Sequence, residues 1–130
     1  MKIFDSGDGW GSKVNFIDKN NVLVGYDTLQ DGCENAGWFI SDDEKNDINN
    51  GENKNNNVDG YSFDTSYFVE VEASMGHGDG CLEAGGMVRF KLTSKNKPNL
   101  YLHIYNSHNG CYGHGFTATI SEKGWQSGTL

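Results

Sequence analysis

Residues 13–28, KVNFIDKNNVLVGYDT, decide the fold class of the chain. Apolar side chains occupy every second position on both sides of Lys19-Asn20-Asn21: Val14, Phe16, Val22, Val24 and Tyr26. Such alternation is typical of a strand with one buried face, and asparagine tolerates the positive φ that a tight turn requires. The stretch therefore predicts a β-hairpin.

The same alternation recurs along the chain, at residues 67–73, 87–94 and 100–105. We also expect an edge strand near residues 2–4 and closing strands at 117–121 and 125–130. Ser41 followed by the acids at 42–44 is compatible with one helical turn, but no long amphipathic helix and no internal repeat occur. Strands at short spacing predict an all-β fold: a single antiparallel sheet, a sandwich or an open barrel of about six to eight strands, with little helix.

A chain of 130 residues suits one domain with its own core, so we expect a single β-rich domain over residues 1–130. The formal net charge of −8 argues against general nucleic-acid binding, which depends on neutralising phosphates. No segment has the apolar length of a membrane span or of a secretory signal. Three cysteines do not make a disulfide framework. We expect a cytoplasmic protein whose partners include neither nucleic acid nor membranes.

Asparagine dominates the region from about residue 46 to residue 60, which contains little that can be buried. We expect a mobile loop there. Both a tolerated surface insertion and a functional lid fit this composition.

The strand expected at 100–105 is the main candidate for binding. One of its faces is apolar and predicted to join the core: Leu100, Leu102 and Ile104. The opposite face carries three rings that can stack on a planar ligand and hydrogen-bond it: Tyr101, His103 and Tyr105. Arg89, the only arginine in the chain, is expected on a neighbouring strand, where its guanidinium can bind a phosphate or carboxylate. The alternative is an outer sheet face whose rings only cover their neighbours.

Antiparallel pairing of residues 67–73 with residues 87–94 allows cross-strand charge pairs. In this arrangement Glu70 and Glu72 lie opposite Arg89 and Lys91, which would fix the register at modest energy.

Glycines bracket the turn that follows the candidate strand. Exposed N–H groups in such a turn can form a nest for an anion, and we include Asn109, Gly110, Tyr112 and Gly113 as candidate ligand-binding residues. The alternative is a tight turn whose glycines serve only the backbone.

A zinc site is a further alternative, formed by His77, Cys81, Cys111 and His114. Their spacing matches no standard zinc knuckle, so no cofactor is expected, and buried thiols and hydrogen-bonded histidines are the favoured explanation of these residues. No dinucleotide, P-loop or metalloprotease motif is present, and a binding role is favoured over an enzymatic one.

Three segments carry a resemblance to a known group of proteins: KVNFIDKNNVLVGYD at 13–27, DGCENAGWFI at 31–40 and LYLHIYNSHNGCYGHGF at 100–116. The chain resembles a family of small uncharacterised proteins of bacteriophages and mobile elements, over most of its length outside the asparagine-rich region. Members often carry two adjacent cysteines where this chain has Gly32-Cys33. The resemblance implies an accessory protein, in the host cytoplasm, that blocks or sequesters a host component, and it transfers no functional residue.

Our leading expectation is a non-enzymatic binding protein that captures a small planar anionic ligand resembling a nucleotide. We also expect it to form a homo-oligomer. One alternative is an acidic inhibitor module that binds a basic host protein through Asp42, Asp43, Glu44, Asp47 and Glu52. The other is a zinc-dependent hydrolase or a zinc-stabilised fold.

Overall fold

The computed structural model describes residues 1–7, 11–29, 35–45, 57–72, 85–107 and 113–130. These residues contain no helix and form nine strands: β1 (Lys2–Ser6), β2 (Lys13–Ile17), β3 (Val22–Asp27), β4 (Asn35–Ser41), β5 (Ser62–Glu72), β6 (Gly85–Thr93), β7 (Leu100–Ser107), β8 (Gly115–Ile120) and β9 (Lys123–Thr129). The all-β prediction is confirmed. The count exceeds the expected six to eight because residues 35–41, which the sequence shows only as a short apolar run, form a complete strand.

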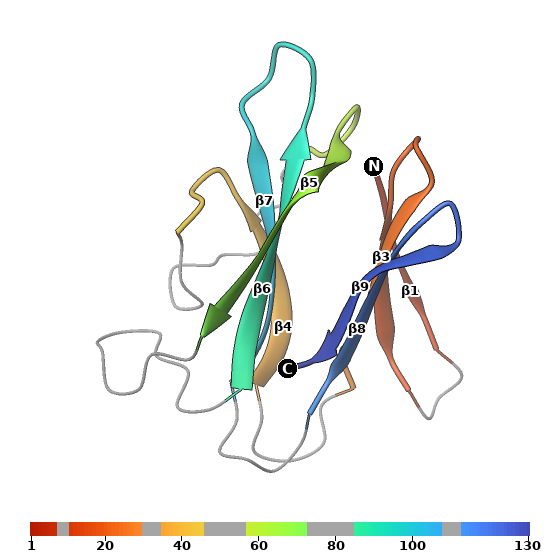
Figure 1. Ribbon diagram of the computed structural model, residues 1–130, viewed down its shortest axis with the longest axis vertical. Helices are drawn as coiled ribbons and strands as arrows, with labels where there is room; N and C mark the ends of the chain where they lie inside the picture. The colour runs from red at the N-terminus through yellow and green to blue at the C-terminus, as the bar shows by residue number, and fades with distance from the viewer. Residues whose placement is uncertain (8–10, 30–34, 46–56, 73–84, 108–112) are drawn as a thin grey trace.

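The strands form two antiparallel sheets that are not closed into a barrel. The five-stranded sheet has the order β1-β2-β3-β8-β9, and the four-stranded sheet has the order β4-β7-β6-β5. Figure 1 shows the sheets as two separate layers, with β5, β6 and β7 in one layer and β1, β3, β8 and β9 in the other. The architecture is therefore a sandwich, one of the alternatives expected from the sequence.

The hairpin predicted at 13–28 is present as β2 and β3. Val14 pairs with Tyr26 and Phe16 with Val24, so the alternating apolar residues share one face of the five-stranded sheet. Asn21 has a φ of 60°, the positive value that favours asparagine in this turn.

The core lies between the two sheets and is dominated by aromatic rings. The Phe90 ring of β6 lies 5.9 Å from the ring of Phe63, 5.4 Å from that of Phe68 and 5.8 Å from that of Trp125 on β9. Leu100, Leu102 and Ile104 are buried in the same cluster, as expected for the apolar face of this strand. Apolar residues from both sheets thus form one shared core.

The asparagine-rich region differs from the expectation at its end. Residues 46–56 lie outside the described residues, so the mobile loop remains a prediction there. Val58, however, is only 9% exposed and belongs to the core cluster, and its carbonyl accepts a hydrogen bond from the N–H of Tyr61 at 3.1 Å. The chain therefore re-enters the core before residue 60, because Val58 and Tyr61 provide apolar surface within a polar context.

The expected charge pairing between β5 and β6 is wrong. Val69, not Glu70, lies opposite Arg89, while Glu70 lies opposite Val88. The ring of Phe68 packs against the core. Glu70 is two residues later in β5, so it lies on the same face of the strand as Phe68. Arg89 and Glu70 are consequently on opposite faces of the four-stranded sheet.

The helical turn suggested after Ser41 is also absent from the described residues. Instead, the Ser41 hydroxyl accepts a hydrogen bond from the N–H of Asp43, and the Asp43 carboxylate accepts one from the N–H of Lys45, both at 2.9 Å. Short side chains that hydrogen-bond the backbone two residues on favour turns over helices. None of the described segments is a helix with the length and apolar character of a membrane span.

Candidate functional site

The outer face of the four-stranded sheet brings the predicted strand residues together. Antiparallel pairing of β6 with β7 places Arg89 opposite His103 and Lys91 opposite Tyr101. On the other side of β7, Phe39 of β4 lies opposite His103. Alternation along three neighbouring strands therefore lines up a ring, an imidazole and a guanidinium across the sheet.

His103 is fully buried in this row, with 0% of its surface exposed. Its ring stacks on Phe39 with centroids 4.3 Å apart and an interplanar angle of 14°. The Nε of Arg89 donates a hydrogen bond to Nδ1 of His103 at 3.3 Å. Since arginine can only donate, the neutral imidazole carries its proton on Nε2, and this buried nitrogen has no hydrogen-bond partner among the described residues.

The surroundings of His103 keep its ring neutral. Burial, followed by the positive charge of Arg89, lowers the pKa of His103 from 6.5 to about 4. The backbone and carboxylate of Asp43 favour the charged ring but do not offset these two effects. His103 is therefore a neutral hydrogen-bonding group near pH 7.

Arg89 is buried without a matching acid. It is 8% exposed, and no carboxylate of the described residues lies within 4.0 Å of its guanidinium nitrogens. Arg89 interacts with Tyr67, whose hydroxyl donates a hydrogen bond to Oε1 of Glu44 at 2.9 Å. Burial and this bond to Glu44 raise the pKa of Tyr67, whereas Arg89 acts in the opposite direction. The positive charge of Arg89 thus has only indirect compensation within the described part of the chain.

Aromatic rings and a lysine border the Arg89–His103 pair. The rings of Tyr67 and Tyr101 lie 5.8 Å apart at 57°, and the Lys91 ammonium is 6.0 Å from the centre of the Tyr67 ring. Both tyrosines are half-buried, so part of each remains open to solvent. This side of the site offers aromatic surface and a second positive charge.

Tyr105 belongs to a neighbouring cluster and not to the arginine pair. Its ring lies 6.1 Å from that of Phe39 and packs against the cluster of Phe39 and Met87, and burial raises its pKa. Its hydroxyl lies over Gly37, where an added Cβ would be 2.6 Å from the Tyr105 oxygen. Tyr105 therefore supports the row from one side, and only glycine at position 37 leaves room for its ring.

The glycine-rich turn is not brought to the same place. Gly113 lies in a different pocket, between the sheets, while Asn109, Gly110 and Tyr112 lie outside the described residues. Of the zinc alternative, His77, Cys81 and Cys111 lie outside them as well. His114 is buried, with its Nδ1 2.8 Å from the carbonyl oxygen of Asp27. No group of three metal-ligating side chains occurs within the described part of the chain.

The acidic surface is described only in part. Asp42, Asp43 and Glu44 are exposed in the turn after β4, and Asp47 and Glu52 lie outside the described residues. Because Glu44 holds the Tyr67 hydroxyl, this turn borders the candidate site.

Two members of the site were missed in the sequence. Phe39 appears there only as part of a short apolar run, and Tyr67 was not connected with the ring-bearing strand. The sequence does contain a signal for Tyr67. Tyr67 and Phe68 are neighbours in a strand and must point to opposite faces, so Tyr67 lies on the face of β5 that adjoins Lys91. Phe39 carries no such local signal, because its position depends on the pairing of β4 with β7.

No protein-family model, curated protein or solved structure matches this chain. The resemblance to phage proteins therefore remains a prediction.

Proposed function

We propose that the protein is a non-enzymatic binding protein that captures a small planar anion, of nucleotide-like chemistry, at Arg89. The burial of this arginine without a carboxylate partner is the observation that supports the proposal. Removing a charged group from water costs several kcal/mol unless another charge or a set of hydrogen bonds compensates it. A bound anion would supply that compensation.

The donors around Arg89 suit a phosphate or carboxylate group. A guanidinium offers five N–H groups in a planar fork, of which the Nε–H is occupied by His103. The proton on Nε2 of His103 is a further donor without a partner among the described residues. Lys91 adds positive charge beyond the pair.

The aromatic rings favour a planar ligand body. Tyr101 and Tyr67 are half-buried at the edge of the pair, where a flat heterocycle can lie against a ring while its anionic group reaches Arg89. In the phage context that the sequence resemblance suggests, the ligand is a nucleotide-like molecule of the host, and the protein acts by sequestering it.

Binding of mononucleotides tests this function. The protein is titrated calorimetrically with inorganic phosphate, AMP and GMP, and a nucleotide-rich extract is screened by native mass spectrometry. We expect Arg89→Gln to weaken retention by about 10- to 100-fold, the effect of losing charge-assisted hydrogen bonds. Lys123→Gln, which removes an exposed positive charge from β9 of the other sheet, is the control and should leave the affinity nearly unchanged.

A stability measurement separates binding from a purely structural role. Arg89→Met removes a buried charge but keeps much of its volume, so the free energy of unfolding of the ligand-free protein should stay within about 1 kcal/mol or rise. The proposal is wrong if the protein retains no anion and Arg89→Met lowers the free energy of unfolding by several kcal/mol. Arg89 would then be a structural residue.

A further inference from the structure

A separate pocket lies between the two sheets, on the opposite face of the four-stranded sheet from Arg89. Its volume is about 500 Å³, within the range of small-molecule sites. Its apolar lining includes Val88, Phe116 and Leu130, and Glu70 contributes a carboxylate. The pocket thus combines apolar surface with the carboxylate of Glu70.

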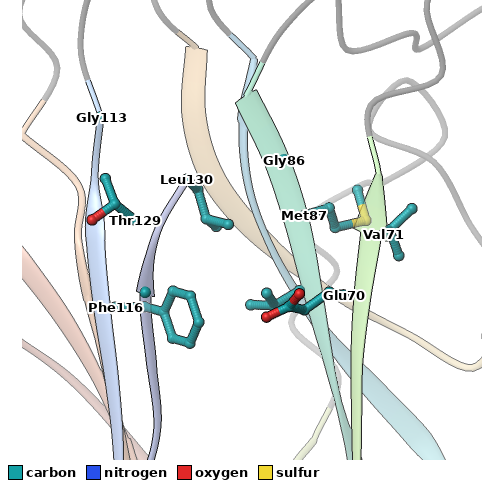
Figure 2. Close-up of a pocket in the computed structure, with 10 residues that line it drawn as sticks. Glu70, Val71, Gly86, Met87, Gly113, Phe116, Thr129 and Leu130 are labelled. Atoms are coloured by element: carbon teal, nitrogen blue, oxygen red, sulfur yellow. The ribbon is translucent and has the colours of Figure 1, made fainter.

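Glu70 lies on the face of β5 that is turned toward the other sheet, and its side chain is exposed to solvent where it lines the pocket. It pairs with Val88, which is 1% exposed, and follows two residues after Phe68, whose ring lies 6.1 Å from that of Phe116. Figure 2 shows the Glu70 carboxylate directed toward the side of Phe116 and Leu130, whereas the side chains of Met87 and Val71 point away. The Glu70 carboxylate is therefore accessible to a ligand in a pocket whose other lining is largely apolar.

The backbone conformation does not require a glycine at position 86, where the pocket has no side chain. Gly86 of β6 is one of its lining residues, and its φ is not in the left-handed region. A Cβ added at Gly86 would meet Leu130 Cδ2 at 3.5 Å, an ordinary van der Waals distance. An alanine would therefore be tolerated and would partly fill the pocket, yet the position carries no side chain.

We propose that this pocket binds a small apolar amine, with its ammonium group on the Glu70 carboxylate and its hydrocarbon body against Phe116, Val88 and Leu130. No described cation forms an ion pair with Glu70, and the aromatic ring of Phe116 lines the same pocket. The formal net charge of −8 attracts cations to the protein as a whole. This site is independent of the anion site, which lies on the other face of the sheet and requires the opposite ligand charge.

Three probes of similar shape test the charge preference: 2-phenylethylamine, 2-phenylethanol and 3-phenylpropionate. Binding is followed by amide chemical-shift changes in NMR spectra of the intact chain at millimolar probe concentrations. We expect the amine to bind about tenfold more tightly than the alcohol and the carboxylate not to bind, because only the amine complements Glu70.

Variants assign the binding to this pocket. Glu70→Gln should remove the preference for the amine over the alcohol, and Gly86→Ala should weaken both probes while leaving the thermal unfolding midpoint nearly unchanged. Glu122→Gln, the same substitution at an exposed turn position, should have no effect. The proposal is overturned if no probe binds, if the amine and the alcohol bind equally, or if Glu70→Gln and Glu122→Gln have equal effects.

Discussion

At the residue scale, the contact between Arg89 and His103 determines the charge state of the candidate site. Arg89 donates to Nδ1 of a ring that burial already keeps neutral. The ring in turn occupies only one of the five donors of the guanidinium. The pair therefore leaves positive charge and unused donors together on a largely buried surface, which is the chemistry that an anion requires.

The neutral state of His103 predicts a dependence of stability on pH. The folded pKa is about 4 and the ordinary value is 6.5, so the unfolded chain takes up a proton first as the pH falls. The stabilising contribution is fully present above pH 6.5 and is lost between pH 6.5 and about pH 4. Its size is about 3 kcal/mol.

NMR titration of the His103 ring protons checks this prediction directly, and urea unfolding at several pH values gives the accompanying loss of stability. A ring that titrates near 6.5 in the folded protein would contradict it. A saturating anion at Arg89 should raise the pKa of His103, because it screens the second cause of the shift.

At the scale of elements, a buried aspartate connects the hairpin of β2 and β3 to the other sheet. Oδ1 of Asp18 accepts hydrogen bonds from the N–H groups of Asn20 and Val22, both at 2.9 Å. Oδ2 accepts one at 2.8 Å from the N–H of Phe63, the second residue of β5. One carboxylate thus accepts hydrogen bonds from backbone N–H groups of the hairpin turn and of the first residues of β5 in the other sheet.

We expect Asp18→Ala to lower the free energy of unfolding by about 2–4 kcal/mol, because it leaves buried N–H groups without an acceptor. Urea denaturation measures this change. Asp64→Ala is the matched control: Asp64 accepts only from Ser66, in an exposed contact at the irregularity of β5 between Phe63 and Phe68, so its loss should cost less than about 1 kcal/mol. Equal effects of the two substitutions would show that the bond between the sheets contributes little.

At the scale of the whole molecule, Phe90 joins the two layers into one core. Its ring is fully buried and contacts Phe63 and Phe68 of its own sheet and Trp125 of the other. A core shared in this way couples the unfolding of both sheets.

Phe90→Ala should therefore reduce stability by about 3–5 kcal/mol, a large part of the total for a domain of this size. Far-ultraviolet circular dichroism reports on the strands, and tryptophan fluorescence reports on packing near Trp38 of the four-stranded sheet and Trp125 of the five-stranded sheet. We expect both signals to change in one coincident transition, in the variant as in the parent protein. Separate transitions would mean that the sheets unfold independently.

Local periodicity by itself determined most of the strands and most of their faces, with β4 as the exception. Val14 and Phe16, or Leu102 and Ile104, alternate with polar neighbours, and the pleat of a strand sends such residues to one side whatever the partner strand is. The sequence therefore sufficed for an all-β fold, for the hairpin at residues 13–28 and for the shared face of Tyr101 and His103.

Only the tertiary structure decided which strands pair, and this decided the sites. The pairing of β4 with β7 placed Phe39 opposite His103. The register of β5 with β6 placed Val69, and not Glu70, opposite Arg89. On β5 the sequence offers two apolar faces, Phe68 on one and Val69 with Val71 on the other, and packing of Phe68 against the core selected between them. Such choices depend on contacts between residues far apart in the chain, which a pattern within one segment does not contain.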